Sequence, residues 1–79
     1  MEILVNRIYK HFKGDHYLVL ALARHSETDE KYVVYRELYA PYEVWVRPAS
    51  LFLDVLDKEK YPNILQERRF ELVDIKSVR

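Results

Sequence analysis

The chain contains a single glycine, Gly14, and its position constrains the fold more than any other residue. It lies in the tripeptide Lys13-Gly14-Asp15, between two apolar runs. Glycine adopts positive φ without steric cost and Asp tolerates the same region, so the tripeptide predicts a tight turn. We therefore expect a β-hairpin that joins a strand over residues 8–12 to a strand over residues 16–24.

The segment 16–24 is apolar at both alternating positions, which leaves two interpretations open. Its Leu and Ala content favours a helix by intrinsic propensity. Its short length and the turn signals on both sides favour a central strand that is covered on both faces. We expect the strand.

Two further strands follow. The polar residues 25–31 lead to residues 32–38, whose β-branched and aromatic side chains are typical of a strand, so a second hairpin is expected. After a break at residues 39–42, residues 43–47 alternate again and Pro48 ends the strand. In that strand Val44 and Val46 share one face, and Trp45 and Arg47 share the other.

The C-terminal third predicts one more strand. Apolar residues at positions 51, 52, 55 and 56 have partly helical spacing, which indicates a short helical turn or an irregular strand. Residues 57–67 form a mostly polar excursion, and alternation resumes over residues 69–75. The pattern predicts a mainly β fold: a small five-stranded barrel with at most a short helical turn.

Composition limits the class of protein. The 79 residues, 49% of them hydrophobic and 14% aromatic, suit one domain over residues 1–79. The absence of cysteine excludes disulfides and thiolate zinc sites. No secretory leader or membrane-length apolar run is recognised, which predicts a cytoplasmic protein. Thirteen basic residues balance thirteen acidic ones, which disfavours nonspecific nucleic-acid binding.

The segment His25-Ser26-Glu27-Thr28 offers an imidazole, a hydroxyl and a carboxylate, as a hydrolase would require. Neighbouring residues on a strand point to opposite faces, whereas a nucleophile and its base must lie within hydrogen-bond reach. We therefore favour a turn in which these side chains cap backbone groups, and we assign no catalytic residue. The three histidines have no second ligand at a recognised spacing, so no metal or other cofactor is predicted.

The best candidate site combines Tyr35, Trp45 and Arg47. An exposed aromatic surface with a guanidinium holds planar or anionic ligands by stacking and bidentate hydrogen bonds. The alternative is packing, with Trp45 half-buried against a long loop and Arg47 paired with a glutamate: Glu27, Glu37 or Glu43. The sequence leaves both open. The candidate ligand-binding residues are His25, Glu27, Tyr35, Trp45 and Arg47.

These motifs also carry a family resemblance. The residues involved are Tyr9, His11, Lys13-Gly14, Tyr17, His25-Ser26-Glu27-Thr28, Val33-Val34-Tyr35, Leu38-Tyr39, Trp45-Val46-Arg47-Pro48, Phe52 and, more weakly, Arg69-Phe70. Together they resemble the domain-of-unknown-function 1653 family of small bacterial proteins. The resemblance implies an SH3-like barrel and a bacterial, cytoplasmic setting, with no established activity and no catalytic residue to transfer. The polar stretch 57–67 is longer than in the usual family pattern.

Three functional hypotheses follow. The leading one is a non-enzymatic binding module that recognises a small ligand, a peptide or a partner protein through the Tyr35, Trp45 and Arg47 face, with His25 and Glu27 at its rim. The second is a small enzyme that uses His25 and Glu27 for acid-base chemistry and Arg47 to stabilise an anion. The third is binding of single-stranded nucleic acid on aromatic platforms. The chain is expected to be a monomer or a weak homodimer, because an exposed edge strand can pair two copies.

Overall fold

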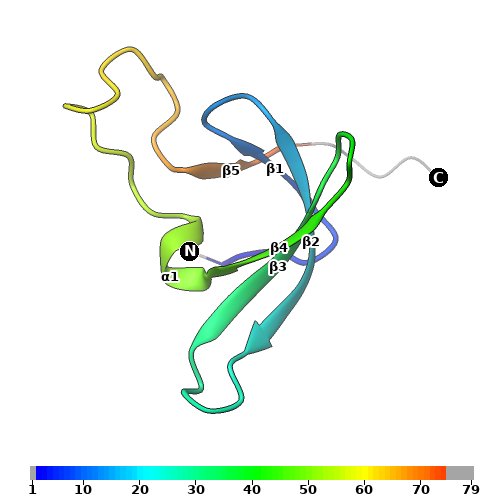
Figure 1. Cartoon of the computed structure of the whole chain (residues 1–79). Coiled ribbons are helices and arrows are strands. Elements are labelled where there is room, and N and C mark those ends of the chain that lie inside the picture. The colour runs from blue at the N-terminus through cyan, green and yellow to red at the C-terminus, as the bar shows by residue number, and fades with distance from the viewer. Residues whose placement is uncertain (1, 75–79) are drawn as a thin grey trace.

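The computed structural model describes residues 2–74, which form one antiparallel sheet and one short helix. The elements are β1 (Ile8–His11), β2 (His16–Arg24), β3 (Lys31–Glu37), β4 (Val44–Pro48), α1 (Ala49–Phe52) and β5 (Phe70–Leu72). The strand order is β4-β3-β2-β1-β5, and the sheet curls around its core (Figure 1). The predicted mainly β class with five strands and a short helical turn is confirmed.

The first hairpin turns at the single glycine, as predicted. Gly14 has a φ of 111°, and the His11 N–H donates to the Asp15 carbonyl oxygen at 2.8 Å to close the turn. An L-residue at this φ is strained, which explains why glycine stands here. The hairpin places β1 against β2, with Tyr9 opposite Tyr17.

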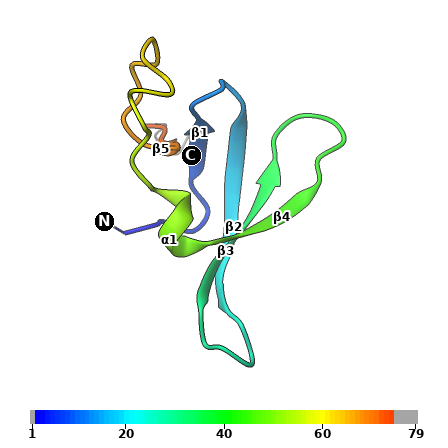
Figure 2. The same cartoon turned by 60° about the vertical axis from the view of Figure 1, so that its left-hand side comes forward.

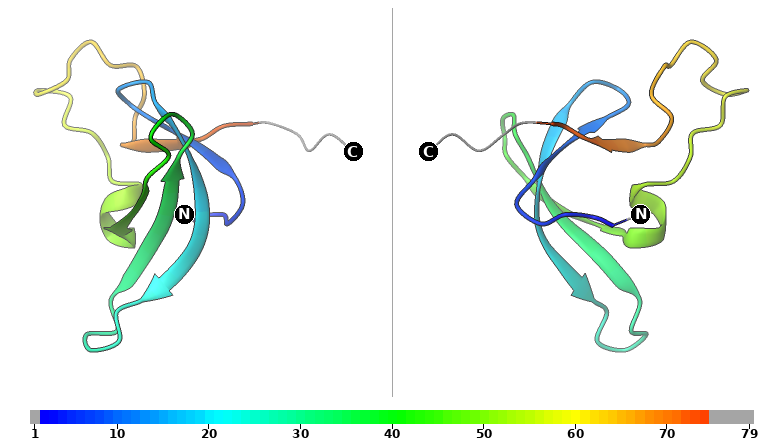
Figure 3. Two further views of the ribbon diagram at one scale, coloured as in Figure 1. Left: turned by 45° about the vertical axis from the view of Figure 1, so that its right-hand side comes forward. Right: turned by 180° about the vertical axis from the view of Figure 1, so that it is seen from behind.

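Strand β2 is central in the sheet, but the expectation that it is covered on both faces was wrong. Val19 is fully buried, whereas Leu22 is 52% exposed. The pairing with β3 shifts between Val19 and Ala21, so Leu20 is the extra residue of a β-bulge that bends the strand. Beyond the bulge the β2–β3 hairpin projects away from the rest of the described fold (Figure 3), and residues 21–24 of β2 are exposed.

Aromatic side chains fill the concave side of the sheet. Phe52 from α1 stacks on Phe70 from β5, with ring centroids 4.1 Å apart and ring planes 5° from parallel. Tyr9 and Tyr35 meet Phe52 edge to face from the sheet. Edge-to-face and offset contacts of this kind add to the stabilisation from burial. The short helix α1 therefore places one large aromatic ring, that of Phe52, in the core.

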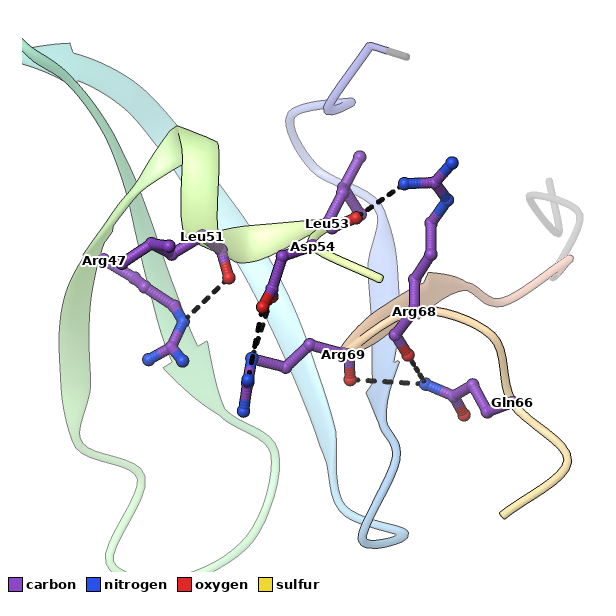
Figure 4. A network of polar contacts seen from close by, with 7 residues as sticks. All are labelled: Arg47, Leu51, Leu53, Asp54, Gln66, Arg68 and Arg69. Carbon is purple, nitrogen blue, oxygen red and sulfur yellow. Dashed lines mark hydrogen bonds and ion pairs between the residues drawn. The ribbon is translucent and has the colours of Figure 1, made fainter. Parts of the chain in front are cut away.

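The sheet does not close, so the predicted barrel is open. Within residues 2–74 no pairing joins β4 to β5, the two edge strands. Two arginines just before β5 bridge to the segment that follows α1: Arg68 donates to the Leu53 carbonyl and Arg69 to the Asp54 carboxylate (Figure 4). Arg47, on β4 itself, donates to the Leu51 carbonyl of α1. An isolated antiparallel bridge joins Val55, in the segment after α1, to Arg68, just before β5.

The polar excursion 57–67 is an ordered loop in which the Lys58 ammonium donates to the carbonyl oxygens of Ile64 and Gln66. Past this loop, β5 pairs with β1 and ends at Leu72. The predicted end of this strand at Ile75 lies outside the described residues. No helix within residues 2–74 is long and apolar enough to cross a membrane.

Candidate functional site on the edge strand β4

The register of β3 and β4 brings together the three residues of the predicted aromatic and arginine face. Tyr35 lies directly opposite Trp45, and Val33 lies directly opposite Arg47. Residues that are directly opposite in an antiparallel pair point to the same face. Tyr35, Trp45 and Arg47 therefore share the concave face of the sheet, and we call them the β4 face.

The members of the β4 face differ in exposure. Tyr35 is only 8% exposed and belongs to the core, whereas Trp45 is 47% exposed and Arg47 is half-buried. Burial raises the pKa of the Tyr35 phenol, and the nearby Arg47 guanidinium partly opposes that shift. The accessible part of this face thus consists of the Trp45 ring and the Arg47 side chain.

A buried glutamate fixes the orientation of Trp45. Glu37 is 6% exposed, and its Oε2 accepts a hydrogen bond from the Trp45 Nε1–H at 2.8 Å. Its other oxygen, Oε1, accepts from the Glu43 backbone N–H at 3.1 Å. Both carboxyl oxygens are therefore engaged, as a buried polar group requires. The indole is held by its N–H while much of the ring faces solvent.

Arg47 does not pair with a glutamate. Its Nε–H donates to the Leu51 carbonyl oxygen at 3.1 Å. The ion pairs within residues 2–74 are Arg24–Asp29 and Arg69–Asp54. Arg47 is thus oriented by the backbone of α1, and its charge has no carboxylate partner among the described residues.

The His11 imidazole lies near cationic side chains, one of which is Arg47 of the β4 face. Burial lowers the pKa of the His11 imidazole, and the guanidinium of Arg69, the ammonium of Lys13 and the guanidinium of Arg47 lower it further. The His11 Nδ1 accepts a hydrogen bond from the Lys13 N–H at 3.1 Å, so the neutral ring carries its proton on Nε2. The Tyr17 ring of β2 packs edge to face near His11, and its hydroxyl shares a hydrogen bond of 2.6 Å with the hydroxyl of Tyr39 in the β3–β4 turn.

His25 and Glu27 lie elsewhere. The His25 Nδ1 accepts hydrogen bonds from the backbone N–H groups of Glu27 and Thr28, at 3.1 and 3.3 Å, in the turn between β2 and β3. His25 also lines a shallow hollow with Tyr32 and Val46, and Val46 is on the face of β4 opposite to Trp45. The structure therefore does not bring His25 and Glu27 to the rim of the β4 face.

Sequence reasoning missed the role of Glu37, which it considered only as a partner for Arg47. Alternation along β3 carries the signal, because Val33, Tyr35 and Glu37 fall on the same face. A glutamate two residues from a core tyrosine must find donors, and Trp45 is the nearest side-chain donor on the neighbouring strand. The hydrogen bond between Trp45 and Glu37 can therefore be predicted only once the β3–β4 register is known.

Sequence reasoning also missed a groove of about 630 Å³ that is bounded by the N-terminal segment, the β2–β3 hairpin and α1. Its lining includes Ile3, Leu22, Ala49 and Leu53, which are too far apart in the sequence for a motif to reveal them. None of the five predicted site residues lines it. Within residues 2–74 there is no cluster of three or more His, Asp or Glu side chains suited to a metal ion.

Comparison with known families identifies the chain. A family model described as "Protein of unknown function (DUF1653)" matches residues 7–72, which is most of the sequence. The chain belongs to the DUF1653 family. A crystal structure of a DUF1653 protein from Bordetella bronchiseptica is similar over 96% of this chain and 95% of its own, with 35% identity and a TM-score of 0.74. No curated protein matches this DUF1653 chain significantly.

Proposed function

We propose that this DUF1653 protein is a non-enzymatic binding module of the bacterial cytoplasm, built on an SH3-like fold. Its β4 face recognises a small ligand, a peptide or a partner protein. Trp45 supplies a flat apolar platform, and Arg47 supplies directed N–H donors beside it. Tyr35 supports the platform from the core.

The observation that carries this proposal is the hydrogen bond between the Trp45 indole and buried Glu37. A tryptophan that serves only the core is mostly covered, but Trp45 is 47% exposed. Because the N–H is held by a buried carboxyl group, the ring loses little conformational freedom when a partner covers it. Exposed and preorganised tryptophans with a neighbouring arginine are typical of the residues that dominate binding energy.

The geometry gives no support to the enzyme alternative. General acid-base chemistry requires the acid and base within hydrogen-bond reach of one substrate atom. The His25 Nδ1 accepts a hydrogen bond from the backbone of its own turn. The His25 side chain lies on the side of β4 away from Arg47. Nucleic-acid binding is kept as one outcome of the test below.

The test uses the intrinsic fluorescence of Trp45, which is the sole tryptophan of the chain. Pools of metabolites, nucleotides, short peptides and oligonucleotides are titrated into the protein. We expect a saturable change in emission that is strongly reduced in Arg47→Ala. The matched control is Arg36→Ala, because Arg36 is an exposed arginine of β3 that lies opposite Val44, on the other face.

The folding of two variants decides whether the face is structural. Circular dichroism should show folded protein for Trp45→Ala and for Arg47→Ala. Loss of the fold in both would mean that these residues maintain the structure, and the binding proposal would fail.

A further inference from the structure

The free edge of β4 carries backbone groups that the sheet does not use. β4 is an edge strand, and the border of the sheet that it forms is visible in Figure 2. The Glu37 N–H donates to the Glu43 carbonyl oxygen at 2.9 Å, which sets the phase of the β3–β4 ladder. In an antiparallel pair, hydrogen-bonded and non-bonded positions alternate. Trp45 and Arg47 therefore bond to β3, whereas Val44 and Val46 direct their N–H and C=O groups to the free edge.

The same two residues are apolar and exposed. Val44 is 52% exposed and Val46 is 62% exposed, both on the convex face of the sheet. Edge strands are usually protected by a charge, a proline or a bulge. In β4 the only proline is the last residue, Pro48, so the part between Val44 and Val46 is a template for another strand.

We propose that β4 pairs antiparallel with β4 of a second copy of this chain, about a two-fold axis at Trp45. This inference rests on the proposed function, because it takes the β4 face as the binding surface and names its partner. The pairing extends the five-stranded sheet across the two copies.

The phase of the ladder determines the hydrogen bonds of the pair. Val44 of one copy stands opposite Val46 of the other, and each such pair exchanges two N–H···O=C bonds. The valine side chains then cover each other on the convex face. Trp45 faces Trp45 of the second copy at a non-hydrogen-bonded position, where opposed side chains are closest.

Charge complementarity favours this register over one centred on Val46. With Trp45 at the centre, Glu43 of each copy stands opposite Arg47 of the other, so two cross-strand ion pairs form on the concave face. Within residues 2–74 of a single copy, Glu43 has no cationic partner and Arg47 has no carboxylate partner. A register centred on Val46 would instead place Glu43 opposite Ala49, where β4 has ended and α1 begins.

The contact is small, which defines the kind of dimer expected. It consists of one short strand from each copy, with two valines, one tryptophan and one ion pair per side. Interfaces below the standard size are weak and reversible. The two copies should therefore exchange rapidly and depend on protein concentration.

The first test follows amide NMR shifts of labelled protein during dilution, without any added ligand. We expect concentration-dependent shifts at residues 43–47 and at the Trp45 indole N–H. Spectra that do not change up to millimolar concentration overturn the proposal, as do changes confined to other strands.

Charge reversal tests the register. Glu43→Arg and Arg47→Glu should each weaken self-association by about tenfold, because attraction becomes repulsion at two symmetric sites. A mixture of the two variants should restore pairing, since each charge then meets its opposite. Labelled Glu43→Arg protein that shows no shift upon addition of the unlabelled Arg47→Glu variant overturns the register.

A backbone variant covers the case in which Arg47→Glu does not fold. Val46→Pro removes an N–H that faces the free edge and leaves the β3 ladder intact, and proline is tolerated at such edge positions. We expect a folded protein without self-association, whereas Val46→Thr should still associate. Self-association that survives Val46→Pro overturns the proposal.

The outcomes separate this inference from the proposed function. If dilution changes nothing but a ligand pool alters Trp45 emission, self-pairing fails and the binding function stands. If neither experiment gives a signal, both fail.

Discussion

The turn of the β2–β3 hairpin and the edge strand β4 carry the two most distinctive motifs of this chain, and their polar side chains are used differently. In the turn, His25 accepts hydrogen bonds from the backbone of its own motif, at Glu27 and Thr28. In β4, the Trp45 indole donates to Glu37 on the neighbouring strand while much of its ring faces solvent. The His25 imidazole thus forms its hydrogen bonds within the turn, whereas β4 presents to solvent an indole ring whose orientation is fixed by Glu37.

The contrast between the turn and β4 shows that a high density of polar and titratable residues in the sequence does not by itself indicate a binding site. Ser, Thr, Asp and His side chains at turns compete for nearby backbone groups, and this uses their hydrogen-bonding capacity. A strand cannot use its side chains in this way, because successive residues point to opposite faces. The residue that decides the role of Trp45 lies on β3.

Among these substitutions, Glu37→Ala should have the largest effect on stability. The substitution leaves the Trp45 indole N–H and the Glu43 backbone N–H without their acceptor, at a cost of about 2 kcal/mol in the free energy of unfolding. Urea denaturation measures this loss. The control is Glu43→Ala, at an exposed glutamate that lies opposite Glu37 across the β3–β4 hairpin, and it should cost less than about 0.5 kcal/mol. Equal costs for the two variants would remove Glu37 from its assigned role.

Trp45→Phe should have the next largest effect, because it keeps an aromatic ring but deletes the donor to Glu37. We expect a loss of about 1 kcal/mol in urea denaturation, since a buried acceptor loses its partner. Tyr42→Phe provides a control at an aromatic residue that is 55% exposed and should be close to neutral. No loss in Trp45→Phe would mean that packing alone orients the indole.

The pH dependence of stability tests the positive charge beside the β4 face. The folded pKa of His11 lies below its ordinary value of 6.5, chiefly because of burial and then because of Arg69, Lys13 and Arg47. As the pH falls through 6.5, the unfolded chain binds a proton before the folded chain does, so stability should decrease. Urea denaturation between about pH 5 and 8 measures this dependence.

In His11→Gln the contribution of this group should disappear, and the decrease in stability on acidification should become smaller. An unchanged profile would show that the imidazole is not held in its neutral form by its surroundings. NMR titration of the His11 ring gives the same information directly, and a midpoint above 6.5 would contradict the account.

His25→Ala, in the turn between β2 and β3, should have the smallest effect on stability. Two exposed side-chain to backbone hydrogen bonds are lost, which should cost about 0.5 kcal/mol in urea denaturation. The emission of Trp45 and its response to ligand pools should not change, because His25 is on the other side of β4. If His25→Ala abolished the response of Trp45 emission to ligand, the turn and the β4 face would belong to one binding site.

Much of the fold was predictable because local signals agreed with each other. Gly14 set the first turn, and alternation over residues 43–47 assigned Trp45 and Arg47 to one face, as the register confirms. The open edge between β4 and β5 was not predictable, since it depends on how strands that are distant in the sequence are placed relative to each other. The exposure of β2 beyond its bulge was also missed, because an apolar sequence does not show whether anything covers it.

The candidate site was predictable only in part. The pattern placed Tyr35, Trp45 and Arg47 together, but the rim residues His25 and Glu27 depended on proximity that only the register determines. Arg47 was expected either to bind or to pair with a glutamate. It instead donates to the Leu51 backbone, a partner that composition and spacing do not reveal.

The most direct measurement of the central claim, that the β4 face binds a partner, is a map of amide NMR shifts while the ligand pools are added to labelled protein. The account predicts saturable shifts at Trp45, its indole N–H and Arg47, with little change at residues 25–28. Shifts that centre on the turn, or no shifts from any pool together with none on dilution, would contradict it.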